Sequence, residues 1–222
     1  MNPSSCPYFK FNCWVYGTTA LVLVLAALSI SKGQDVIWIN SRHTLFLNAF
    51  MIFITQLGAG LLFLPLLIAL LFVRFRYSLL TLSIWIGHGI ICAILKRSFF
   101  GYLKRPKELL GNDLLYFVPN VDVHSFFSFP SGHTATIFCL AFLLSLLIRK
   151  RIASFAFLLI ALLVAYSRIY LLQHFLVDVA GGAVIAVVVT YLLWNYFERA
   201  TLPGWMNHHL KINPNFSLRL TS

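Results

Sequence analysis

Charged residues are scarce in this sequence, and acidic residues are scarcer still. Only 10% of its 222 residues are charged, and 6 Asp and Glu stand against 17 Lys and Arg, for a formal net charge of +11. Soluble domains carry about a quarter charged residues, so the composition argues against a water-soluble globular protein. The basic excess does not predict a nucleic-acid partner, because Lys and Arg lie in short clusters between apolar runs and not along one polar face.

Cysteine is also rare. Cys6 and Cys13 precede the first apolar run, whereas Cys92 and Cys139 lie within later ones. There is no CxxC pair and no grouping of Cys and His with the spacing of a metal site. We therefore expect no disulfide framework, no bound metal and no cofactor.

Long apolar runs, in contrast, cover most of the chain, and hydrophobic residues make up 60% of it. Six runs come near the ~17–25 residues that a helix needs to cross the hydrocarbon core of a bilayer. They are Val15–Ile30, Gly58–Val73, Ser78–Leu95, Ser131–Ile148, Ile152–Ile169 and Phe175–Tyr196. The sequence therefore predicts an all-α integral membrane protein, with a bundle of six transmembrane helices at residues 15–196 between terminal segments 1–14 and 197–222.

Two stretches of the first half of the chain leave alternatives open. The apolar segment Leu45–Leu57 carries Asn48, Thr55 and Gln56, which favour an interfacial segment ahead of the second span. The first apolar run could be a cleaved signal peptide because it is short and contains small residues, but the region before it holds a single lysine.

Basic residues predict which side of the membrane each loop faces. Lys10, Arg74, Arg76, Arg149, Lys150, Arg151 and Arg199 would all fall on one side of a six-span bundle. The positive-inside rule makes that side cytoplasmic, and both terminal segments with it. We expect a multi-pass protein of a bacterial inner membrane, with loops near residues 31–44, 96–130 and 168–174 on the periplasmic face.

The outward loop at residues 96–130 breaks this charge rule. It carries Lys96, Arg97, Lys104, Arg105 and Lys107. An anionic group at the outer surface would account for this concentration of positive charge.

Pro130-Ser131-Gly132-His133 stands at the start of the fourth predicted span. Proline suits the first turn of a helix, where the N–H groups of Ser131, Gly132 and His133 would be unpaired donors. Glycine lets an anion approach the backbone closely, so the tetrapeptide is suited to bind phosphate. A serine cap on an ordinary transmembrane helix explains it equally well.

His174 and Asp178 lie four residues apart and would share one face of a helix. The carboxylate could accept a hydrogen bond from one imidazole nitrogen and leave the other free as a nucleophile. Asp178 is the only acidic residue within a predicted span, where an unpaired carboxylate is costly enough to suggest a function. The alternative is a structural pair of Asp178 with Arg168 that holds two helices together.

These motifs resemble signatures of the type 2 phosphatidic acid phosphatase superfamily over about residues 45–196. Pro130–His133 is similar to the second signature, and Ser167-Arg168, five residues, His174, three residues and Asp178 to the third. The first signature, Lys, six residues and Arg-Pro, is matched imperfectly: Arg105-Pro106 is present, but Ser98 stands at the lysine position. A longer loop could return Lys96 to that place, with Arg97 as the substitute.

The resemblance implies a metal-independent lipid phosphatase with an outward-facing site. His174 would be the nucleophile, Asp178 would orient it, and His133 would be the general acid and then the base. The phosphoryl oxygens would be held by Lys96, Arg105, Ser131, Gly132 and Arg168, with Arg97 and His124 as further candidates. The substrates that the resemblance implies are phosphatidic acid, phosphatidylglycerol phosphate, undecaprenyl diphosphate and the phosphates of lipid A.

Two other functions fit the same motifs. A phosphotransferase would pass the phosphoryl group to a second lipid or sugar instead of water. A non-catalytic lipid-binding or transport protein would need the cations, but it has no need of two histidines and an orienting carboxylate. The sequence does not indicate an oligomeric state.

Overall fold

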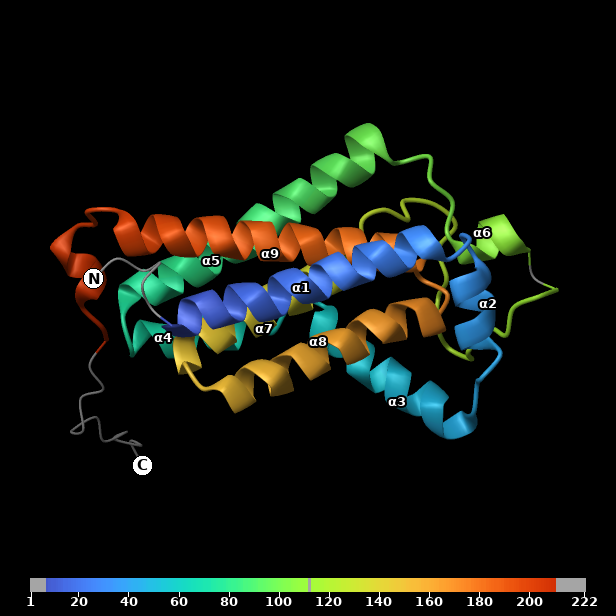
Figure 1. Ribbon diagram of the computed structural model, residues 1–222, viewed down its shortest axis with the longest axis horizontal. Coiled ribbons are helices and arrows are strands. Elements are labelled where there is room, and N and C mark those ends of the chain that lie inside the picture. The colour runs from blue at the N-terminus through green and yellow to red at the C-terminus, as the bar shows by residue number, and fades with distance from the viewer. Residues whose placement is uncertain (1–6, 112, 211–222) are drawn as a thin grey trace, which may run out of the picture.

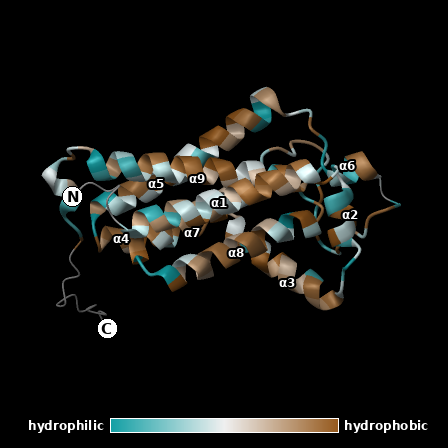
Figure 2. Cartoon of the chain, in the orientation of Figure 1, coloured by the Kyte–Doolittle hydropathy of each residue, from teal (hydrophilic) through white to brown (hydrophobic). Residues whose placement is uncertain are grey.

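The long helices run roughly along one axis in the computed structural model, which describes residues 7–111 and 113–210 (Figure 1). The α-helices in these ranges are α1 (Pro7–Ser29), α2 (Gln34–Asn40), α3 (Leu45–Thr55), α4 (Phe63–Leu71), α5 (Phe75–Ile94), α6 (Pro106–Leu110), α7 (Gly132–Ile148), α8 (Arg151–Tyr170) and α9 (Leu176–Arg199). No strand occurs in these ranges. The all-helical class is as predicted. Figure 2 shows hydrophobic residues along the bundle and hydrophilic residues gathered toward its two ends.

The number of spans agrees less closely with the prediction. Among the described residues, four helices are long and apolar enough to cross a membrane: α1, α5 with its extension to Phe99, α8 and α9. The pair α3 and α4, bent by 45°, makes a fifth span if it crosses as one unit, and α7 is a shorter apolar helix of 17 residues. Six apolar segments are therefore present, but they are not six long continuous helices.

The second predicted span, Gly58–Val73, is wrong as a continuous helix. The chain forms α3 and a 3₁₀ turn at Gln56–Gly58, breaks, and resumes as α4. Gly60, at φ +84°, adopts a left-handed conformation that ends the first half. The segment Leu45–Leu57 packs against α8 and buries Met51 and Ile54, so it is one half of the bent pair and not a separate interfacial segment.

The central helix is α7, which packs against α5, α8 and α9 and buries nearly all its side chains. A helix that is hydrophobic on every face is stable only when its neighbours surround it. Gly181 and Gly182 allow α9 to approach: added Cβ atoms would lie 2.3 Å from the Phe129 ring and 2.5 Å from the Ser131 carbonyl oxygen. The first turns of α9 therefore press directly on the segment that leads into α7.

The first helix belongs to the packed bundle. The Tyr16 hydroxyl bonds the Ser145 hydroxyl (3.0 Å), and Asn12 Nδ2 donates to the Ser145 carbonyl (3.4 Å), both buried contacts with α7. Cleavage before α1 ends would remove these partners, so we propose that the helix is retained. It begins at Pro7 and α9 ends at Arg199, so both extend beyond the predicted residues 15–196. Parts of the two terminal segments, residues 1–6 and 211–222, lie outside the described residues.

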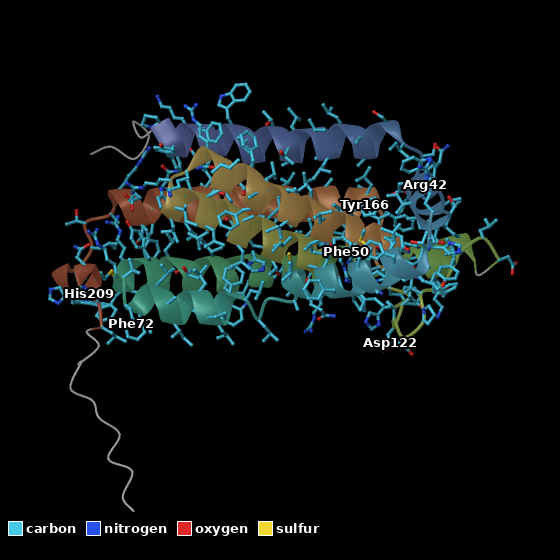
Figure 3. All side chains as sticks on the ribbon, turned by 90° about the horizontal axis from the view of Figure 1, so that it is seen from below. Arg42, Phe50, Phe72, Asp122, Tyr166 and His209 are labelled. Atoms are coloured by element: carbon cyan, nitrogen blue, oxygen red, sulfur yellow. The ribbon has the colours of Figure 1, made fainter. Side chains whose placement is uncertain are left out.

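The two ends of the bundle differ in what they carry. The start of α1 and the end of α9 lie at one end, and α2, α6 and the loop before α7 lie at the other (Figure 1). Figure 3 shows Phe72 and His209 at the first end and Arg42 and Asp122 at the second. The described tail folds back over the first end, because the Phe75 and Leu210 N–H groups donate to the His208 and Leu71 carbonyls (both 2.9 Å).

Candidate active site

Three stretches that are distant in sequence meet at the end of the bundle opposite the termini. The Ser131 N–H donates to the Asp178 carbonyl (2.9 Å), which joins the start of α7 to the first turn of α9. The His133 imidazole interacts electrostatically with three cations, Arg168, Lys96 and Arg105. The motifs of the loop, of α7 and of the α8–α9 turn therefore form one site.

A polar cavity of about 280 Å³ opens in this region. His133 and Arg168 line it, together with Thr55, His124 and Gln173. His174 is not part of the lining; it is 2% exposed and lies beside the cavity, where its backbone N–H donates to the Arg168 carbonyl (3.1 Å).

His174 and Asp178 are paired, as their spacing predicts, but His174 lies in the turn before α9 and not on the same helix as Asp178. His174 Nδ1 lies 3.5 Å from Asp178 Oδ2, longer than an ordinary hydrogen bond, and has no hydrogen-bond partner among the described residues. Burial lowers the pKa of His174 below the usual range for histidine, and the Asp178 carboxylate partly opposes that shift. The imidazole is therefore neutral at physiological pH, and the nitrogen facing away from Asp178 has a lone pair for attack.

Asp178 is fixed by groups that the sequence analysis did not identify. Its Oδ2 accepts hydrogen bonds from the Ser128 hydroxyl and from the Phe175 N–H (2.9 Å). Ser128 is fully buried and lies two residues before Pro130. No spacing rule points to a serine in an irregular loop, so only the folded chain reveals this contact.

Replacing Ser128 by alanine should lower kcat about tenfold while leaving the fold intact. The substitution removes a charge-assisted hydrogen bond, of about 1.5–3 kcal/mol, from the carboxylate that orients His174. Phosphate release from a lipid phosphate in detergent measures the effect, and Ser125→Ala, in the same loop, is the matched control. An unchanged kcat for Ser128→Ala would show that the Phe175 N–H alone holds Asp178.

Arg168 is nearly buried, at 8% exposure, and has no acidic partner among the described residues. Its Nη1 donates to the Thr55 hydroxyl (2.7 Å), whereas its Nε has no partner within the same ranges. The structural alternative of an Arg168–Asp178 pair is therefore not what the chain forms. A buried guanidinium with free donors is suited to bind an anion.

Arg105 is held in a defined orientation at the edge of the site. Its Nε donates to the Phe126 carbonyl (2.9 Å) and its Nη1 to Gln173 Oε1 (2.8 Å). Gln173 in turn donates to the Asp122 carbonyl (2.7 Å). Gln173, which the sequence analysis also missed, thus links the basic loop to the turn that carries His174.

The imperfect first signature falls on an irregular helical segment. Residues Leu95–Phe99 form a π-helix, which holds more residues per turn than an α-helix and accommodates the longer spacing before Arg105. Lys96 is half-buried and is acted on by the charges of Arg105, Asp178 and Arg168, whereas Arg97 is exposed. Of these two basic residues, Lys96 is the one that the fold turns toward the site.

The start of α7 agrees with the sequence prediction only in part. Ser131 caps the helix, because its hydroxyl oxygen accepts from the Thr134 N–H (3.4 Å); it also accepts from the Thr134 hydroxyl (2.9 Å). The prediction of a free Ser131 N–H is wrong, since that group is bonded to Asp178. Gly132 has no neighbouring atom within 4 Å of an added Cβ, so its surface is open to a ligand.

Two other histidines occupy different environments. His124 is exposed and lines the cavity. His88 is buried and satisfied: its Nδ1 donates to the Ile84 carbonyl (2.8 Å), so its Nε2 accepts from the Thr136 hydroxyl (3.1 Å). His88 is a packing residue. Within residues 7–111 and 113–210 there is no group of three or more His, Cys, Asp or Glu that could hold a metal ion.

Known proteins resemble the chain in sequence and in fold. Undecaprenyl-diphosphatase BcrC of Bacillus subtilis is 28% identical over 171 residues, 71% of this chain and 79% of that protein. The crystal structure of LpxE from Aquifex aeolicus superposes with a TM-score of 0.64 at 29% identity, covering 72% of this chain and 93% of the other. That of a transmembrane PAP2-type phosphatidylglycerolphosphate phosphatase from Bacillus subtilis gives 0.63 at 26% identity, covering 85% and 97%.

A model of the PAP2 superfamily matches residues 76–202, which is more than half of the chain. That range contains all three motifs that meet at the cavity, and the fold agrees with membrane proteins of the same kind. The chain belongs to the PAP2 superfamily, as its two complete signatures predicted, and is a membrane lipid phosphatase that works through a histidine.

Proposed function

We propose that His174 attacks the phosphorus of a lipid phosphate monoester or diphosphate and forms a phosphohistidine that water then hydrolyses. The observation that carries the proposal is a polar cavity lined by His133 and Arg168, with the neutral, buried imidazole of His174 beside it and the charges of Lys96 and Arg105 acting on His133. Arg168, which is 8% exposed, has no acidic partner among the described residues. The site thus contains a nucleophile, a proton carrier and unneutralised positive charge.

The proposed reaction has two steps. As the bond from His174 to phosphorus forms, the bond to the leaving oxygen breaks, and protonated His133 gives that oxygen its proton. His133 then takes a proton from water, which attacks the phosphohistidine and releases phosphate. Asp178 stabilises the positive imidazole ring, while Lys96, Arg105 and Arg168 hold the phosphoryl oxygens.

An apolar groove supports a lipid as the substrate. A cavity of about 340 Å³ between α4, α7 and α8 is lined by Leu57, Ile137, Leu140 and other apolar residues. Ile137 lies one turn from His133 on α7, and Gly58, next to Leu57, packs against His133. A hydrocarbon chain in this groove would place its phosphate at the polar cavity.

Charge supports an outward-facing site in a bacterial inner membrane. Arg74, Arg76, Arg149 and Arg199 flank helix ends at the end of the bundle where α1 begins and α9 ends (Figure 1). The cavity residues His133 and Arg168 lie at the start of α7 and the end of α8, toward the other end. The positive-inside rule assigns the first end to the cytoplasm. The proposed site therefore faces the periplasm and meets lipids of the outer leaflet.

A panel of lipid phosphates tests the proposal. Purified protein in detergent is given phosphatidic acid, phosphatidylglycerol phosphate, undecaprenyl diphosphate or lipid A, and free phosphate is measured. The curated relative is a diphosphatase and one structural relative a phosphatidylglycerolphosphate phosphatase, so both head groups belong in the panel. Release of free phosphate without an added acceptor supports hydrolysis, whereas phosphorylation of an added acceptor without release of free phosphate would identify a phosphotransferase.

Phosphate release should be insensitive to chelators. The proposed mechanism draws its positive charge from Lys96, Arg105 and Arg168, so an excess of EDTA should change kcat by less than about twofold. The rate on the best lipid of the panel is compared before and after dialysis against EDTA. Loss of activity that added Mg²⁺ or Zn²⁺ restores would contradict the proposal.

A further inference from the structure

Helix α9, which carries Asp178, begins without a capping side chain of its own. Its N-cap residue is Phe175, which has no acceptor, and Asp178 Oδ2 is already occupied by the Phe175 N–H. The next donor, the Leu176 N–H, donates to Asp35 Oδ2 (2.6 Å). Asp35 lies 141 residues earlier in the chain. Asp35 thus performs the capping role that serine or aspartate usually has at the helix start.

Asp35 is held firmly in place. It is 8% exposed, and its Oδ1 accepts from the Gly33 N–H (3.0 Å). Gly33, at φ +97°, makes the left-handed turn that brings Asp35 to the first turn of α2. In the same turn, Lys32 Nζ lies 4.8 Å from the centre of the Phe175 ring. Asp35 and Lys32 therefore contact Leu176 and Phe175, two consecutive residues at the start of α9.

The far end of α2 is anchored to the same region. Asn40 accepts from the Tyr116 N–H (2.7 Å) and donates to the carbonyls of Tyr116 (2.9 Å) and Tyr170 (3.4 Å). Tyr170 is the last residue of α8, four residues before His174. Helix α2 therefore bridges the end of α8 and the start of α9, and His174 lies in the turn between them.

We propose that Asp35 is a positioning residue that sets the placement of His174 relative to Asp178. His174, Phe175 and Leu176 are consecutive, so a shift of the Leu176 N–H moves the imidazole against a carboxylate that is 3.5 Å away. Asp35 lies outside the residues that match the superfamily model, 76–202. The inference rests on the proposed role of His174 as the nucleophile.

The hydrogen bond can be removed from either side. Asp35→Ala deletes the acceptor. Leu176→Pro deletes the donor, and the backbone tolerates proline there because position 176 is the first of the helix and Phe175 has an extended ψ of 165°. Asp113→Ala is the charge-matched control, since Asp113 is exposed in an outer loop. The double variant Asp35→Ala/Leu176→Pro completes a cycle.

Each single variant should lower kcat about ten- to a hundredfold, with KM and inhibition by inorganic phosphate changed by less than about twofold. The double variant should be no slower than the slower single one, because both remove the same bond. A thermal unfolding transition shows whether each protein is folded. If Asp35→Ala does not fold, the kcat of Leu176→Pro tests the positioning role instead. A wild-type kcat in a folded single variant, or losses that multiply in the double, would overturn the inference. If His174→Ala remains active in the same assay, the proposed function itself is wrong. If His174→Ala is inactive but the Asp35 and Leu176 variants behave as wild type, only the positioning role of Asp35 is wrong.

Discussion

His174→Ala should reduce phosphate release by about 10⁴-fold or more, because it removes the atom that forms the covalent intermediate. Lys96, Arg105 and Arg168 remain in the variant, so lipid phosphate should still bind. Steady-state phosphate release and binding of a fluorescent lipid phosphate in detergent measure the two effects separately. A protein that only binds or transports lipid would release no phosphate with or without His174.

The control for this variant is His209→Ala. His209 is exposed at the opposite end of the bundle (Figure 3), so its removal should leave kcat unchanged. Residual activity of His174→Ala above one tenth of wild type would exclude His174 as the nucleophile. Loss of lipid binding together with activity would instead mean that His174 holds the head group.

The sequence was most informative where a short motif lies at the end of a helix. Pro130–His133 lies at the start of α7, and Arg168–Asp178 spans the end of α8, a short turn and the first turn of α9, so the sequence spacing keeps the residues of each motif close together. The meeting of the two motifs across the bundle depends on Gly181 and Gly182, which let α9 approach the start of α7. The grouping within each motif and the all-helical class could therefore be predicted.

The partners of these residues could not be predicted in the same way. Ser128 and Gln173 are single polar residues in irregular segments, and only the folded loop brings them to Asp178 and Arg105. Thr55 was visible as a polar residue in an apolar run and favoured an interfacial segment. In the fold it accepts a hydrogen bond from Arg168, so its polarity belongs to the site.

Irregular helices account for the remaining differences. A uniform helix was assumed from Gly58 to Val73, but Gly60 at positive φ breaks it and leaves a bent pair. In the first signature a longer loop was expected to return Lys96 to the lysine position, and Lys96 lies instead in a π-helix at Leu95–Phe99. Hydrophobic periodicity does not report such local changes of helix type, since apolar composition continues through them.

His133→Ala should lower turnover of a lipid phosphate by about 10²- to 10⁴-fold, the usual contribution of general acid–base catalysis. The two steps should respond differently to the leaving group. The nitrophenolate of p-nitrophenyl phosphate departs without a proton, so the first step should stay close to the wild-type rate. The second step still needs His133 to activate water, so phosphohistidine should accumulate.

Rapid mixing of His133→Ala with p-nitrophenyl phosphate therefore should give a burst of about one nitrophenolate per enzyme followed by slow turnover. Lys96→Ala is the comparison, because a residue that holds phosphoryl oxygens affects both steps and both substrates alike. A burst slowed as strongly as the lipid reaction would show that His133 binds the phosphoryl group and carries no proton. If wild type and His133→Ala gave equal bursts and the same steady-state turnover, His133 would have no role in either step.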